Sequence, residues 1–247
     1  MGNCKVIMVT SCKGGVGKST VSAGLGCALA QLGRNVLLLD GDAGLRSLDL
    51  ILGIGSEAVY DLSDVFAGRC EPIRAIYPSP ICERVSVIPA PVSLSDLCAP
   101  SDLRRLCRGF TRYYDEVIVD CPAGLGDGFE TAVAAADRAL VVTTPDLVCA
   151  RDAGIVSTLL VRRQLPARLL INRLRVAPIL RGKTPDVDDI IDMAGLQLIG
   201  ILPEDEQVTL ASANGQPLPT DCTAHEALHR IALRLCGEEM PLCRFTG

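Results

Sequence analysis

The chain alternates short, strongly apolar runs with longer stretches in which apolar and polar residues mix. The apolar runs predict seven strands, at residues 5–10, 35–40, 84–90, 116–122, 138–144, 167–173 and 196–203. The stretches between them predict helices at residues 18–32, 59–67, 101–113, 127–136, 147–163, 186–194, 205–214 and 222–236. This alternation is typical of βαβ units, so we predict an α/β fold with a mostly parallel sheet of about seven to eight strands and helices on both faces.

The composition fits such a sheet. Apolar residues make up 49% of the 247 residues, but aromatic residues only 3%, and Trp is absent. The core must therefore consist mainly of Val, Ile, Leu and Ala, which suits strands that are buried on both faces. Because no linker, internal repeat or low-complexity tract divides the sequence, we expect a single domain over residues 1–247.

Charge and hydropathy limit the partners of the protein. A formal net charge of -5 gives no general attraction to nucleic acid or to anionic lipid. No apolar stretch approaches the roughly 18 residues that a membrane-spanning helix needs. A local basic feature lies at Arg104, Arg108 and Arg112, which recur every fourth residue of a predicted helix, with Arg105 beside them. We interpret it as a solvated helix face rather than a DNA-binding surface.

Cysteine and histidine usage does not indicate a metal site. The twelve cysteines include no CxxC pair, and the initial sequence MGNCKVIMVTS shows no export signal, so we expect a cytoplasmic protein with reduced thiols. His225 and His229 are four residues apart and are expected to share one face of the last predicted helix. Cys98 and Cys121 are expected to be small buried residues rather than ligands of an iron–sulfur cluster.

Residues 10–20, TSCKGGVGKST, follow a predicted strand and open a predicted helix, which is the context of a phosphate loop. The backbone N–H groups of residues 14–18 can form a nest for a β-phosphate at the positive end of the helix. Lys18 is expected to reach the β- and γ-phosphates, the Ser19 hydroxyl to bind Mg²⁺, and Thr20 to lie near the α-phosphate. The sequence therefore predicts that ATP and Mg²⁺ bind at Gly14, Gly15, Val16, Gly17, Lys18, Ser19 and Thr20.

Three carboxylates stand where predicted strands end. Asp120 closes the run EVIVD, and Asp40 and Asp42 belong to a DGD at the end of another run. Because the carboxyl ends of parallel strands meet at one edge of the sheet, we expect all three near the phosphates. Asp120 is placed to hold Mg²⁺ through its water shell. Asn172 also ends a predicted strand, and its amide offers adenine both a donor and an acceptor.

Lys13 is a second lysine in the loop, too early to add to what Lys18 does for the same nucleotide. The motif KGGVGKS resembles the deviant Walker A loop of the ParA/MinD family of P-loop ATPases, which includes septum site-selecting, DNA-partitioning and nitrogenase iron proteins. The segments LLLDGDAGLRSLDLILG (37–53), VIVDCPAGLGDG (117–128) and GILPEDEQVTLASANGQPL (200–218) extend this resemblance. It is strongest to the septum site-selecting branch.

The resemblance implies a three-layer P-loop NTPase fold and roles for particular residues. In the family, the first lysine crosses an ATP-dependent homodimer to the phosphates of the partner's nucleotide, and Lys13 would do so here. Asp42 would position the attacking water, while Asp40 would support the metal shell. The resemblance also places the base between two loops, and the residues implied there are Asn172, Arg173, Pro203 and Asp205.

The resemblance further implies an ATP-hydrolysing switch. Its dimer recruits a division inhibitor and is released when a topological-specificity partner stimulates hydrolysis. Members of this branch typically end in a basic amphipathic helix that binds membrane, whereas residues 237–247 carry two Glu and one Arg and are too short to bury an apolar face. We therefore expect that helix to be absent and membrane binding not to occur unaided, with the cytoplasm as location and the inner face of the cell membrane as the alternative.

Two other functions stay open at this point. A DNA-partitioning ATPase would use the same dimer to bind DNA non-specifically, and an iron–sulfur carrier or reductase ATPase would use cysteines instead.

Cys12 departs from the family pattern, which usually has Gly at that point. If the backbone there needs a positive φ, Cys costs about 1 kcal/mol, and otherwise the change is nearly silent. We expect that Cys12 has almost no effect on the loop, because the rest of the motif is retained. A second hypothesis is that Lys13, Lys18 and the helix N-terminus lower the pKa of the Cys12 thiol and make it sensitive to oxidation.

Overall fold

The structure, a computed structural model, describes residues 5–43, 46–91 and 99–243. Eight strands form one sheet in the order β3-β4-β2-β5-β1-β6-β7-β8. They are β1 (Lys5–Thr10), β2 (Val36–Asp40), β3 (Tyr77–Pro78), β4 (Val85–Ile88), β5 (Glu116–Asp120), β6 (Arg138–Thr143), β7 (Ala167–Leu174) and β8 (Leu198–Pro203). Every neighbouring pair is parallel except β3 with β4, so the predicted mostly parallel sheet is confirmed.

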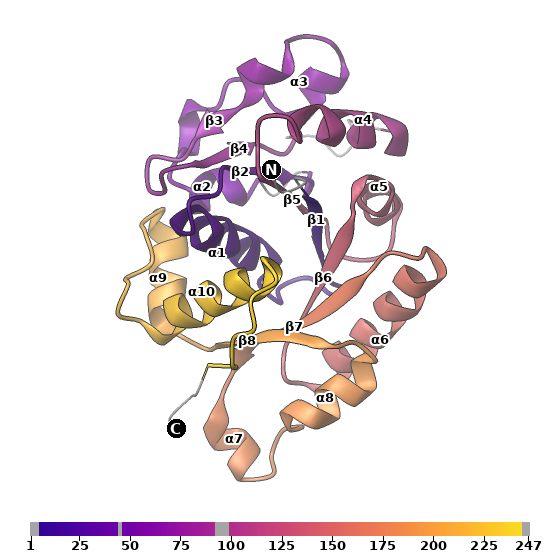
Figure 1. Cartoon of the computed structure of the whole chain (residues 1–247), viewed down its shortest axis with the longest axis vertical. Coiled ribbons are helices and arrows are strands. Elements are labelled where there is room, and N and C mark those ends of the chain that lie inside the picture. Colours follow the sequence, from indigo (N-terminus) through magenta and orange to yellow (C-terminus); the bar gives the residue numbers. More distant parts are fainter. Residues whose placement is uncertain (1–4, 44–45, 92–98, 244–247) are drawn as a thin grey trace.

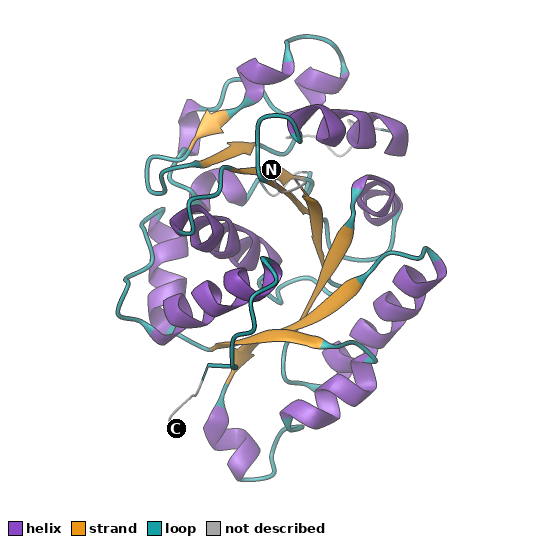
Figure 2. Ribbon diagram, in the orientation of Figure 1, coloured by secondary structure: helices purple, strands orange, loops and turns teal. Residues whose placement is uncertain are grey.

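Helices cover both faces of this sheet (Figures 1 and 2). One face carries α1 (Lys18–Gln31), α2 (Leu48–Ile51), α9 (Glu206–Asn214) and α10 (Thr223–Leu235). The other face carries α3 (Leu62–Phe66), α4 (Pro100–Phe110), α5 (Asp127–Ala135), α6 (Leu147–Arg162) and α8 (Val187–Ala194). The remaining helical elements are α7 (Val176–Leu180) and the 3-10 helices η1 (Gly55–Glu57) and η2 (Pro72–Ala75). None of the helices within the described residues combines the length and apolar character needed to cross a bilayer.

The strands alternate their side chains between two apolar cores. On β1, Val6 and Met8 join the core shared with α4, α5 and α6, whereas Ile7 and Val9 join the core shared with α1 and α10. All four side chains are fully buried. Successive strand residues point to opposite faces, and helices cover both faces here, so the central strands are continuously apolar. Polar side chains that could bind a ligand are therefore expected at the ends of these strands.

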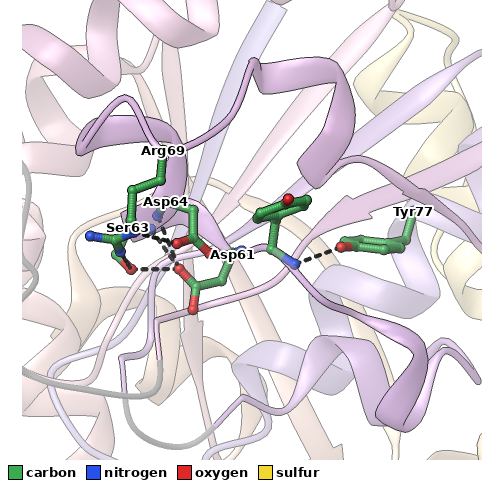
Figure 3. Close-up of polar contacts among 6 residues, drawn as sticks. Asp61, Ser63, Asp64, Arg69 and Tyr77 are labelled. Carbon is green, nitrogen blue, oxygen red and sulfur yellow. Dashed lines mark hydrogen bonds and ion pairs between the residues drawn. The ribbon is translucent and has the colours of Figure 1, made fainter.

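The helix predicted at 59–67 begins later than expected because a capping box fixes its start. The Asp61 carboxylate accepts a hydrogen bond from the Asp64 N–H at 3.3 Å, and the Asp64 carboxylate accepts one from the Asp61 N–H at 3.0 Å (Figure 3). The N–H of Tyr60 donates instead to the Tyr77 hydroxyl at 2.8 Å. Tyr60 therefore belongs to the loop, and α3 starts after the N-cap.

The helix predicted at 101–113 ends earlier, and this changes the basic stripe. The Thr111 hydroxyl donates to the carbonyl of Arg108 at 2.9 Å, a local bond that competes with continuation of the helix. Arg112 consequently lies beyond the end of α4 and does not share its face, so that part of the prediction was wrong. Arg108 is paired with Asp137 at 2.8 Å, which neutralises its charge locally.

The hydrophobic pattern does not predict β3, α2 or α7. They span two, four and five residues, which is too short for a periodic pattern to show. Helix α7 also contains Pro178 and buries none of its side chains, and Leu180 is 79% exposed. Only the partly buried Ile179 of this helix packs against the core, so its sequence does not show the repeating apolar stripe of a longer helix.

Candidate nucleotide-binding site

The predicted phosphate loop connects the end of β1 to the start of α1. Gly15 and Gly17 have φ values of 81° and 91°, a left-handed conformation that favours glycine. A Cβ atom on Gly17 would also lie 2.4 Å from Nδ2 of Asn172. The Asn172 amide donates to the carbonyl of Val16 at 2.8 Å, so β7 is bonded directly to the loop.

The two lysines of the loop have different surroundings. Lys18 is only 6% exposed, whereas the Lys13 side chain is exposed. The Ser11 hydroxyl donates to the Lys13 carbonyl at 2.8 Å and braces the backbone there. Burial raises the pKa of Asp146, but hydrogen bonds from Cys149 and Thr144 and the nearby Lys13 ammonium outweigh it and lower that pKa overall. Lys13 therefore extends from the loop towards the start of α6.

Cys12 does not distort the loop. It is not among the residues with positive φ, so the expected silent replacement of Gly is confirmed. Burial and the charge of Asp152 raise the pKa of its thiol, which contradicts the hypothesis of a lowered thiol pKa. Cys121 is fully buried, as predicted, and burial also raises the pKa of its thiol. Cys98 lies outside the described residues.

Two buried carboxylates meet beside the loop. Asp40 and Asp120 are register partners at the ends of β2 and β5, and both are fully buried. The Ser22 hydroxyl donates to Oδ1 of Asp120 at 2.8 Å, and the Ser19 hydroxyl lies close enough to lower the pKa of that carboxyl. Oδ2 of Asp120 is buried and has no partner within the described part of the chain. An unsatisfied carboxylate oxygen beside a serine hydroxyl fits a cation and its water shell.

Burial makes this pair costly to ionise in the protein alone. Burial and then the neighbouring Asp120 charge raise the pKa of Asp40 to about 7, although the N–H groups of Leu48 and Asp42 donate to it. Burial likewise raises the pKa of Asp120 to about 6, against the opposing effects of its serine hydrogen bonds and Lys18. A bound cation would supply the missing positive charge.

Asp42 is held next to this pair by a tight turn. Its N–H donates to Asp40 at 3.0 Å. Burial raises the pKa of its carboxyl, and the nearby Lys18 ammonium lowers it. Gly41 permits the turn, because its N–H donates to the Asp120 carbonyl at 2.9 Å and a Cβ there would lie only 2.8 Å from that oxygen. The structure thus brings Lys18 and all three predicted carboxylates together.

The buried Asp40 predicts a pH dependence of stability. Without Mg²⁺ and nucleotide, the folded state keeps the Asp40 proton up to about pH 7, whereas the unfolded state loses it near 3.8. The folded state binds more protons in this window, so the free energy of unfolding falls as pH rises from 4 to 7, by about 1.4 kcal/mol per unit. Urea unfolding in a chelator should show a shallower fall for Asp40→Asn. The matched change at exposed Asp192 should follow the wild type, and equal slopes for all three would contradict the expectation.

The residues expected at the base lie at the ends of β7 and β8. Arg173 is exposed in a left-handed conformation, with φ 57°, at an irregularity of β7, and Pro203 ends β8. Asp205 is the N-cap of α9 and accepts a hydrogen bond from the Gln207 N–H at 2.9 Å. Asn172 is bonded to the phosphate loop, as described above. Asn172 therefore lies against the loop, the other three residues lie at the ends of β7 and β8, and contact of the four with a base stays a prediction.

Sequence reasoning missed three residues of this site. The Ser22 hydroxyl donates to Asp120, the Ser11 hydroxyl donates to the loop backbone, and Asp146 lies near enough to Lys13 for that ammonium to lower its pKa. Only Asp146 had a local signal, as the residue before a predicted helix, where an N-cap is expected. Ser22 and Asp120 are far apart in sequence, so their contact arises only from the packing of α1 on β5.

The arrangement of loop and carboxylates agrees with comparison to known proteins. The sequence profile of the family described as "CobQ/CobB/MinD/ParA nucleotide binding domain" matches residues 7–218. This chain belongs to that family.

Close relatives of this MinD/ParA-family protein are septum site-determining proteins. The septum site-determining protein MinD of Bacillus subtilis is 39% identical over 244 residues, which cover 96% of this chain and 91% of the relative. The MinC:MinD cell division protein complex of Aquifex aeolicus matches with a TM-score of 0.91 at 36% identity, over 98% of this chain and 99% of that chain. MinD complexed with Mg-ADP from Pyrococcus horikoshii matches with a TM-score of 0.85 at 28% identity, over 94% and 96%. The predicted family and fold class are confirmed.

Proposed function

We propose that this protein is a switch that binds ATP, hydrolyses it to ADP and phosphate with Mg²⁺, and takes part in selecting the division-septum site. The observation that carries the proposal is the unsatisfied, buried Asp120 oxygen beside Ser19 and the buried Lys18. Similarity to septum site-determining proteins supports the biological role, and the Mg-ADP complex of the Pyrococcus relative supports the nucleotide.

Ser19 and Asp120 would hold the metal ion. Both oxygens of Asp40 already accept backbone hydrogen bonds, so Asp40 would support the metal shell through Asp120 rather than bind the ion itself. Within the described residues, no group of three or more Asp, Glu, His or Cys side chains could hold a metal alone. This agrees with Mg²⁺, which uses one or two protein ligands together with water and the phosphates.

The phosphates would be bound by the backbone N–H groups of residues 14–17 and by Lys18, Ser19 and Thr20. Burial raises the pKa of the Asp42 carboxyl, and the nearby Lys18 ammonium opposes that rise. The Asp42 carboxyl would lie near the γ-phosphate and accept a hydrogen bond from the attacking water. The chemistry needs positioning and charge neutralisation more than covalent catalysis.

The base would be bound by Asn172, Arg173, Pro203 and Asp205. Asn172 uses one amide N–H for the Val16 carbonyl, so we propose that its remaining polar groups meet adenine. The exposed Arg173 and the loop from Pro203 to Asp205 would cover the ring.

Lys13 would complete the switch in a second copy of the chain. Lys13 is exposed and Lys18 is buried, so the Lys13 ammonium would not be needed for the phosphates of its own loop, which Lys18 would bind. We propose that Lys13 binds the partner's phosphates and that loss of the γ-phosphate releases the dimer. The similarity to MinD in the Aquifex MinC:MinD complex supports recruitment of a division inhibitor, and a topological-specificity partner would stimulate hydrolysis.

Hydrolysis at different protein concentrations tests this function. Phosphate release per protomer is expected to rise with protein concentration, because each site needs Lys13 of another copy, and to stop in a chelator. Lys18→Ala should abolish release at all concentrations. A rate per protomer that does not depend on concentration, in protein that stays monomeric, would contradict the proposal.

A further inference from the structure

Two cysteine thiols lie in one cavity, which also borders Thr20 of the predicted phosphate site. Cys27 lies on α1 and Cys82 in the turn that precedes β4, and both side chains are half-buried. They line the same cavity, which is enclosed by α1, the end of α2, α9 and the start of α10. The two thiols lie close enough together for each to shift the pKa of the other. The fold thus brings together two thiols that are distant in the sequence.

The two thiols differ in acidity. The interaction with Cys82 and burial raise the pKa of Cys27, whereas the interaction with Cys27 lowers the pKa of Cys82. The Cys82 S–H itself points to the Glu83 carbonyl at 3.8 Å. Since the thiolate is the reactive form, Cys82 is the nucleophile of the pair.

Five other thiols of the described residues lack this activation. Burial raises the pKa of the thiols of Cys12, Cys70, Cys121, Cys149 and Cys222. A raised pKa leaves little thiolate at neutral pH, and these thiols should react slowly. The pair in the cavity combines an activated thiol with a second thiol in contact with it, which is the arrangement of a peroxide-reactive site.

We propose that Cys27 and Cys82 form a dithiol site that is oxidised by hydroperoxides to a disulfide. The Cys82 thiolate attacks one peroxide oxygen, the O–O bond breaks, and hydroxide leaves and takes up the thiol proton as water. The Cys27 sulfur then attacks the resulting sulfenic acid and releases a second water. Hydrogen peroxide is thereby reduced to two waters while the two thiols lose two hydrogens and two electrons.

The disulfide would tie α1 to a turn that is already connected to α2. The Ser79 hydroxyl donates to the carbonyl of Leu52 at 2.9 Å and accepts from the N–H of Ile81 at 3.3 Å. A sulfur–sulfur bond is shorter than the contact between two thiols, so oxidation draws this turn towards α1. Because the bond closes a long loop, oxidation should raise the melting temperature by several degrees.

Peptide mapping tests the site directly. Trypsin releases Cys27 in residues 19–34 and Cys82 in residues 75–84, and each peptide contains one cysteine. After brief treatment of the reduced, folded protein with limited hydrogen peroxide, we expect these two peptides to be linked before other cysteines react. Cys27→Ser should accumulate a Cys82 sulfenic acid that dimedone traps. Cys82→Ser should lose the link and react with peroxide at least about tenfold more slowly.

Controls separate the proposal from non-specific oxidation. Cys70→Ser changes another half-buried thiol and should leave both the link and its rate unchanged. The same treatment in urea should give mixed links, because the contact exists only in the folded state. Earlier oxidation of another cysteine in the folded protein, or no link between the two peptides, would overturn the proposal. ATP hydrolysis is not needed for any of these measurements.

Discussion

In Mg-ATP, the Asp42→Ala variant is expected to form a dimer, and adding Lys13→Ala is expected to return it to a monomer. Asp42→Ala removes the carboxylate that would position water, so ATP should persist and keep the dimer closed. Removing Lys13 would leave the partner's phosphates without the positive charge that reaches them across the dimer. Breaking such a pair should weaken dimerisation by at least about 100-fold. Light scattering in Mg-ATP and in Mg-ADP measures the mass directly.

The control for this experiment is Lys183→Ala in the Asp42→Ala background. Lys183 is also exposed, but it follows α7 and lies outside the phosphate loop. That variant should dimerise in Mg-ATP like its parent and be monomeric in Mg-ADP. The same mass in Mg-ATP and in Mg-ADP, or a dimer that still forms without Lys13, would contradict the proposed switch.

Asp120→Asn is expected to lower Mg-ATP hydrolysis by at least about 100-fold, which corresponds to about 2.7 kcal/mol of transition-state stabilisation. The change keeps the shape of the side chain but removes the charge that would hold the metal ion. The same variant should be more stable in a chelator at neutral pH. Removing the buried charge stabilises the folded state by about 3 kcal/mol, and the unpaired amide destabilises it by about 1–2 kcal/mol. We therefore expect the free energy of unfolding to rise by about 1 kcal/mol.

Two measurements on one variant distinguish a metal ligand from a purely structural residue. A structural Asp120 would lose stability and activity together on substitution. A metal-binding Asp120 loses activity and gains stability, as measured by phosphate release and by urea unfolding in a chelator. The exposed Asp192→Asn change should alter neither quantity. Hydrolysis by Asp120→Asn within about tenfold of wild type would refute the proposed role.

The sequence predicted the sheet because strands buried on both faces are long apolar runs, which need no tertiary information to be seen. It predicted the phosphate loop because closely spaced glycines and Lys18 form a local motif. The bounds of α3 depended instead on a capping box at Asp61, a side-chain signal outside the apolar pattern. The contact of Ser22 with Asp120 and that of Cys27 with Cys82 join distant segments, so no local pattern contains them.

The bond between Asn172 and the carbonyl of Val16 limits which substitutions relatives of this protein can accept during evolution. The amide lies where a Cβ on Gly17 would have to stand. A relative that acquires any other residue at position 17 must first shorten or turn away the side chain at position 172, and a relative with a smaller residue at 172 loses the brace on its loop. The two positions, 155 residues apart, are therefore expected to change together or not at all during the divergence of the family.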